Sequence, residues 1–159
     1  MMDSEVQLQL ILEPMGGDVP VFVREHLQKL SHDALLSGDV GVSMNEGGWL
    51  WMVNGSERKL WVWRQGNSRR HASPCYILHL STSGLKYSPH TIAVLPTGGD
   101  QHAAMSASVV SVSPEGVIRY WSNGSLAANF QETTVDLHGQ VAHSLTPLHV
   151  SSKRYVRSA

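Results

Sequence analysis

Residues 47–64, GGWLWMVNGSERKLWVWR, carry four of the chain's five tryptophans. The apolar runs WLWMV and KLWVW flank the turn-forming sequence NGSER, which predicts a β-hairpin. The residues that alternate with the tryptophans are also apolar, namely Leu50, Met52, Leu60 and Val62. Because both faces of the hairpin are apolar, we expect both to be covered, with the tryptophans packed between neighbouring sheets rather than forming an exposed binding face.

The turn decides which side chains of this hairpin meet. A five-residue loop over NGSER would place three pairs opposite each other: Trp49 with Trp63, Trp51 with Trp61, and Val53 with Lys59. Each cross-strand aromatic pair would contribute a few tenths to about 1 kcal/mol beyond its buried area. A two-residue turn at Asn54 and Gly55 would shift the register, so the sequence leaves both alternatives open.

Upstream of the hairpin the sequence predicts one short helix. Asp18 and Pro20 precede VFVREHLQKL, and a proline near the first turn is a typical helix start. The apolar side of this helix is expected to consist of Phe22, Val23, His26, Leu27 and Leu30.

From about residue 39 the pattern changes to short apolar runs between turn signals, which indicates strands. The predicted strands are DVGVSM, WLWMV, KLWVW, CYILHL, TIAVL, ASVVSV, VIRYW and QETTVDL, with HSLTPLHV (143–150) as one further strand. Only the tight turn SPEG separates ASVVSV from VIRYW.

The strand pattern repeats along the chain. The hairpin that ends at Trp63 has a counterpart that ends at Trp121, and Leu60 and Val62 fall on Ile118 and Tyr120. Repeated four-stranded meanders that end near a tryptophan are typical of a β-propeller. We therefore predict an all-β fold made of the first two blades of a propeller, each a four-stranded antiparallel meander.

The predicted organisation has three parts. Residues 1–38 form a lead-in with the short helix, 39–150 form the partial propeller, and 151–159 form a basic tail. The blades are expected at about 40–80 and 91–137, followed by the start of a third.

Composition narrows the possible partners. The formal net charge of −1 and an isoelectric point near 6.7 give no basic surface for nucleic acid, so we expect no nucleic-acid partner. No apolar run approaches the length of a membrane span, and direct membrane contact is not evident in this segment. The single cysteine, Cys75, excludes an internal disulfide.

The sequence offers no residues for catalysis. The nine histidines lack the spacing of a metal site, and no nucleophile or phosphate-loop motif is present. We expect no enzyme, cofactor, metal or small-molecule substrate; a metal site would first require His138, His143 and His149 to converge. The structural or interaction candidates are Trp49, Trp51, Trp61, Trp63, Tyr120 and Trp121.

Two segments carry a resemblance to a known family. They are NEGGWLWMVNGSERKLWVWR (45–64) and SVVSVSPEGVIRYWSNGSLAANFQETTVDL (108–137). Their EGGW strand, their lysine-leucine-x-x-tryptophan return strand and the hairpin PEGVIRYW resemble the N-terminal β-propeller of the 133-kDa nucleoporin family. That family belongs to the Y-shaped outer-ring scaffold of the nuclear pore, and the resemblance covers about residues 18–148.

The resemblance implies a non-enzymatic scaffold at the nuclear pore and nuclear envelope. Its implied partners are other scaffold nucleoporins, and its implied role is to support pore assembly and the transport of protein and mRNA. Two blades cannot close a ring of about seven, so we expect a truncated front of such a propeller. A generic interaction module, which binds a partner through an exposed strand edge or a tryptophan face, is the alternative.

Overall fold

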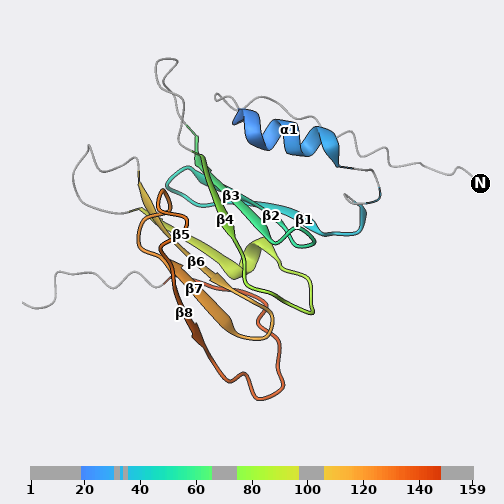
Figure 1. The fold of residues 1–159 in the computed structure, drawn as a ribbon, viewed down its shortest axis with the longest axis vertical. Coiled ribbons are helices and arrows are strands. Elements are labelled where there is room, and N and C mark those ends of the chain that lie inside the picture. The colour runs from blue at the N-terminus through green and yellow to red at the C-terminus, as the bar shows by residue number, and fades with distance from the viewer. Residues whose placement is uncertain (1–18, 31–32, 34–35, 66–74, 97–105, 148–159) are drawn as a thin grey trace, which may run out of the picture.

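The protein consists of two four-stranded antiparallel sheets and one helix in a computed structural model that describes residues 19–30, 33, 36–65, 75–96 and 106–147 (Figure 1). The helical elements are α1 (Val21–Lys29) and the short 3-10 helix η1 (Pro89–Thr91). The first sheet contains β1 (Val40–Met44), β2 (Trp49–Asn54), β3 (Lys59–Arg64) and β4 (Cys75–His79). The second contains β5 (Ile92–Pro96), β6 (Ala107–Val112), β7 (Val117–Trp121) and β8 (Gln131–Thr134).

Both sheets are simple meanders. Their strand orders are β1-β2-β3-β4 and β5-β6-β7-β8, and every neighbouring pair is antiparallel. The repeated tryptophans occupy equivalent places, because Trp63 lies on the third strand of one sheet and Trp121 on the third strand of the other. The predicted pair of four-stranded meanders is thus confirmed, and the described residues do not form a closed ring.

The register of the tryptophan hairpin differs from both predicted alternatives. Asn54 pairs with Lys59, so the loop contains the four residues 55–58. The Asn54 side chain accepts hydrogen bonds from the Ser56 hydroxyl and the Glu57 N–H, and Arg58 adopts a left-handed backbone with φ of 53°. An asparagine that bonds to its own turn in this way fixes the loop length and therefore the register.

This register removes the predicted tryptophan pairs. Trp51 lies opposite Val62, and Trp61 lies opposite Met52. Because alternate residues of a strand point to opposite faces, Trp49 and Trp51 lie on one face of the sheet and Trp61 and Trp63 on the other. Each face of the hairpin therefore carries two of the four tryptophan side chains.

Both faces of the first sheet are covered, as its apolar pattern predicts. The face with Trp49 and Trp51 packs against the second sheet. Helix α1 lies on the opposite side of β1–β4 from β5–β8 (Figure 1). There Val23 packs with Met52, Trp61 and Trp63. One cover is thus a neighbouring sheet, while the other is a helix rather than the second sheet that a propeller blade would have.

Helix α1 is present, but its predicted apolar side is only partly used. Val23 is 1% exposed, whereas Phe22 is 61% and Leu27 39% exposed. Val23 and His26 contact the sheet, while Phe22 and Leu27 of the expected apolar side are exposed.

The expected further strand over 143–150 is wrong in its described part. Residues 143–147 have no strand conformation, and 148–150 lie outside the described residues, as does the predicted basic tail 151–159. The chain instead runs back along the second sheet, where the Ala142 N–H donates to the Pro114 carbonyl and the Leu145 N–H to the His90 carbonyl. These bonds hold the segment outside the strand ladders.

Candidate functional site

The facing surfaces of the two sheets meet in an apolar seam that contains Trp49, Trp51 and Trp121. All three are at most 6% exposed. The Trp51 Nε1–H donates to the Pro89 carbonyl at 2.8 Å, and the Trp121 Nε1–H donates to the Ala127 carbonyl at 3.1 Å. Buried indoles normally need such a partner, so both rings can pack without leaving a polar atom unpaired.

Polar contacts across the seam join the sheets at two further points. The Asn45 side-chain amide donates to the Val94 carbonyl, and the Arg119 guanidinium donates to the His79 carbonyl, each at 2.9 Å. Arg119 also pairs with Glu132 at 2.6 Å. The seam is thus fixed by directional bonds as well as by apolar contact.

Trp61 and Trp63 form a second cluster under helix α1. The ring of His26 lies 4.3 Å from the ring of Trp61, centre to centre, and the His26 Nε2 is 2.9 Å from the Asn54 amide nitrogen. Asn54 is the residue that also shapes the hairpin turn. The helix is therefore tied to the end of the hairpin through a single histidine.

Tyr120 stands apart from the other candidates. It lies on the opposite face of its sheet from Trp121 and is 37% exposed. The structure therefore brings three candidates together in the seam, two under α1, and leaves one on an open face. Exposed fractions of 6% for Trp51 and 3% for Trp61 leave little aromatic surface for a ligand, and the roles of all six residues remain predictions.

The convergence of His138, His143 and His149 that a metal site would require gains no support from the described residues. His138 lies beside Asp136, and His149 lies outside the described residues. In the described parts of the chain, no group of three or more His, Cys, Asp or Glu side chains is placed to hold a metal ion. Nor does any helix there combine the length and apolar character that crossing a bilayer requires.

The Cys75 thiol is a poor nucleophile in this setting. Burial raises the pKa of the thiol to about 11. Because the thiolate is the reactive form, little of it exists near neutral pH. This residue acts as a small apolar side chain beside the cluster under α1.

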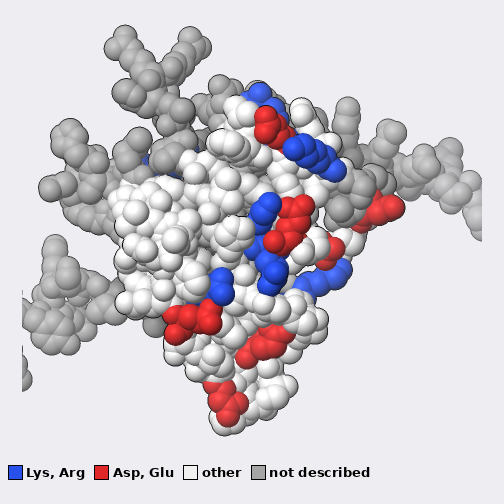
Figure 2. Space-filling view, in the orientation of Figure 1, with Lys and Arg blue, Asp and Glu red and all other residues white. Residues whose placement is uncertain are grey.

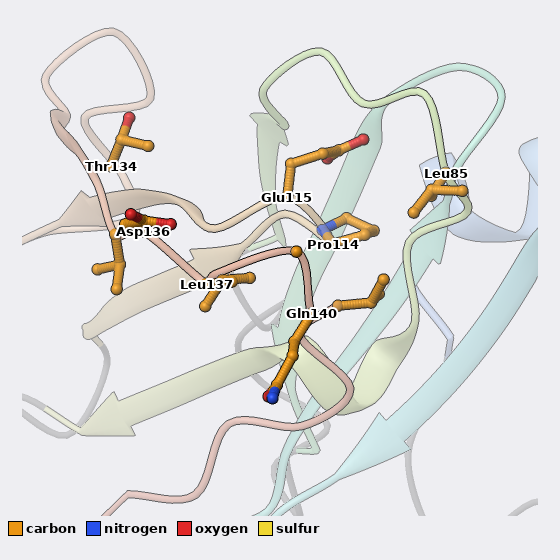
Figure 3. A pocket seen from close by; sticks show the side chains of 10 residues that line it. Leu85, Pro114, Glu115, Thr134, Asp136, Leu137 and Gln140 are labelled. Atoms are coloured by element: carbon orange, nitrogen blue, oxygen red, sulfur yellow. The ribbon is translucent and has the colours of Figure 1, made fainter.

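An open cleft of about 600 Å³ lies at the end of the second sheet, and the sequence did not predict it. Figure 3 shows Leu85 on one side, Thr134, Asp136 and Leu137 on the other, and Pro114 and Glu115 between them. The cleft lies between the SPEG turn and two loops that are distant from it in the sequence. The turn signal was visible in the sequence, but the approach of those loops was not.

The Glu115 carboxylate is held in place at this cleft. Its Oε1 accepts a hydrogen bond from the Ser83 hydroxyl at 2.9 Å and from the Gly84 N–H at 2.8 Å. Partial burial raises the pKa of this carboxyl, but hydrogen bonds from Ser83, from backbone N–H groups and from Ser113 outweigh it, and the pKa lies below its ordinary value. Glu115 therefore carries a negative charge at neutral pH.

Comparison with known proteins identifies relatives of this chain. No protein-family model matches it. It is 30% identical over 133 residues to the nuclear pore complex protein Nup133 of Danio rerio, which covers 83% of this chain. The Mus musculus protein of the same name is 32% identical over 79% of the chain, and that of Drosophila melanogaster is 31% identical over 70%. This chain is related to the Nup133 nucleoporins.

The relationship to Nup133 agrees with the nucleoporin resemblance that the sequence features indicated. The matches span most of this chain, and the two sheets make up most of its described part. The chain covers only 10–11% of the length of these relatives. What the whole Nup133 proteins do therefore enters below as a proposal.

Proposed function

We propose that this chain is a structural part of the nuclear pore scaffold, located at the nuclear pore complex and nuclear envelope. In that role it supports pore assembly and, through it, the transport of protein and mRNA. The observation that carries the proposal is the 30–32% identity to Nup133 relatives from fish, mouse and fly. The buried tryptophans add support, because their area serves packing rather than ligand binding.

The outer face of the second sheet suggests where a further sheet would pack in a larger structure. Its outer face carries Ile118 and Tyr120, and Tyr120 is 37% exposed. The equivalent residues of the first sheet, Leu60 and Val62, are fully buried in the seam. By this equivalence we propose that another sheet covers the outer face in a longer propeller, and that 39–150 is the partial propeller and 1–38 its lead-in.

The proposed partners are other scaffold nucleoporins, and we propose no catalytic activity. The relatives are named as nuclear pore complex proteins, which supports a scaffold assignment. A binding module that uses its tryptophan face is less favoured, since Trp51 and Trp61 are buried.

Localisation tests this proposal. The chain, fused to a fluorescent protein and expressed at low level in cultured cells, should concentrate at the nuclear rim and coincide with a pore marker. The same fusion carrying Trp121→Asp should be diffuse, because a carboxylate in the seam separates the sheets. A fusion that is folded in the cell yet evenly distributed would refute the scaffold role.

A further inference from the structure

Strand β8 presents an open edge. It pairs with β7 on one side, and in the described part of the chain no strand pairs with its other side. All four of its residues are exposed. Natural edges are usually protected by lysine, proline or a bulge, yet the sequence here is QETT, and the Glu132 charge is paired with Arg119. Little therefore prevents another strand from adding to this edge.

The backbone donors of the edge can be assigned from the ladder. The Val135 N–H donates to the Gly116 carbonyl at 2.9 Å, which directs it toward β7. In an antiparallel ladder the N–H groups alternate in direction along the strand. The N–H groups of Thr134 and Glu132 consequently point toward the open side, where an added strand would accept from them.

The open edge leads directly into the cleft. Thr134 is the last residue of β8 and also lines the cleft, so the strand ends at the cleft. The apolar walls of the cleft are exposed: Leu85 is 52%, Val135 45% and Val141 41% accessible to solvent. A chain that extends β8 could place an apolar side chain among these three residues.

The charge of this surface is acidic. The ten residues that line the cleft include Glu115 and Asp136 and no lysine or arginine. In Figure 2 the lower end of the view, where the loop after β8 lies, carries acidic side chains with little basic charge. Glu115 is fixed by Ser83 and Gly84, so its carboxylate is already oriented before any partner arrives.

We infer that the β8 edge and the cleft bind an extended peptide of another protein in which basic residues alternate with apolar ones. The backbone of the peptide adds to β8 as a strand. Its apolar side chains enter the cleft between Leu85 and Val135, and its basic side chains reach Glu115 and Asp136. This surface is separate from the seam and from the outer face of the second sheet, so the inference goes beyond the scaffold role.

Peptide binding to the full chain tests the charge component. The probe is a fluorescein-labelled, acetylated and amidated peptide, Lys-Val-Arg-Val-Lys-Val-Arg-Val, followed by fluorescence anisotropy at low salt. The double variant Glu115→Gln with Asp136→Asn keeps the side-chain shapes and one oxygen acceptor of each group but removes both charges. We expect it to bind about tenfold more weakly.

A matched control separates local contact from overall charge. Glu25→Gln with Glu46→Gln makes the same change in net charge at two exposed carboxylates that do not line the cleft. This variant should bind almost as tightly as the unchanged protein. An equal loss in both double variants would overturn the inference, because attraction would then be non-specific.

The strand component has its own test. Thr134→Pro removes an N–H that points to the open side while leaving the ladder to β7 intact. It should weaken peptide binding severalfold, with an unchanged far-ultraviolet circular dichroism spectrum. Unchanged binding by this folded variant would overturn strand addition. Both results are independent of localisation at the nuclear rim, so failure of the peptide site would leave the scaffold proposal intact.

Discussion

Gly124 shows how closely the two sheets approach. A β-carbon at this position would lie 2.5 Å from Cδ2 of Tyr76, which stacks on Trp49 with ring centres 5.9 Å apart. The tyrosine cannot move without disturbing the seam. The absence of a side chain at residue 124 is therefore a requirement of packing.

We expect Gly124→Ala to lower the free energy of unfolding by about 1–3 kcal/mol, as overpacked sites do. Gly84→Ala is the matched control, because the nearest atom to its β-carbon would be 3.7 Å away. Urea denaturation of the two variants measures the difference. Equal stability of both would show that the sheets do not meet at Tyr76 in solution.

The raised pKa of the Cys75 thiol makes both the stability of the fold and the reactivity of the thiol depend on pH. Its folded-state pKa of about 11 exceeds its ordinary value of 9.0, because burial disfavours the thiolate. The stability that burial of the neutral thiol contributes is therefore complete below pH 9, and it is lost as the pH rises toward 11. We expect iodoacetamide to label the folded chain slowly at pH 8 and much faster in urea, with mass spectrometry as the readout. Equally fast labelling in both conditions would contradict the partly buried position of Cys75.

Helix α1 covers the sheet through two side chains, Val23 and His26. Val23 is buried against Trp61 and Trp63, whereas its larger neighbour Phe22 is mostly exposed. We expect Val23→Asp to detach the helix and shift tryptophan emission to longer wavelength, because the indoles meet water. Phe22→Ala should leave the emission unchanged. A red shift in the Phe22 variant alone would reverse the assigned face of the helix.

The strands were predictable from sequence, and the register was not. Alternating apolar runs and turn residues located the elements, because each signal is local. The register depended on one side chain: Asn54 bonds to Ser56 and Glu57 and holds a four-residue loop. For the candidate residues, too, the sequence predicted local features but not which distant element each side chain contacts. Burial of Trp61 followed from the two-sided apolar pattern, but its cover by α1 depended on how the helix packs.

At the scale of the whole molecule, one core joins both sheets. The seam contains residues from six strands, β2 to β7, and from the segment that connects the two sheets, and Trp121 is fully buried in it. The repeat of Trp63 and Trp121 in similar sequence surroundings predicted two similar units, because residues at equivalent positions of a repeat imply equivalent folds. The repeat could not predict the cleft, which is assembled from residues 85, 114–115, 134–137 and 139–141.

Because the seam is shared, we expect Trp121→Ala to destabilise both sheets together by about 3–5 kcal/mol. Thermal unfolding followed by circular dichroism and by the emission of the remaining tryptophans should give coincident transitions. Two separated transitions would mean that the sheets fold as independent units.

We propose that the tryptophans are packing elements of a two-sheet module and not a binding face. Acrylamide quenching of tryptophan emission in the purified full chain, with and without denaturant, tests it most directly. Exposed fractions of at most 6% predict blue-shifted emission that acrylamide quenches weakly until the chain unfolds. Red-shifted emission that is quenched equally well in the native and the denatured chain would show that the tryptophans are exposed to solvent.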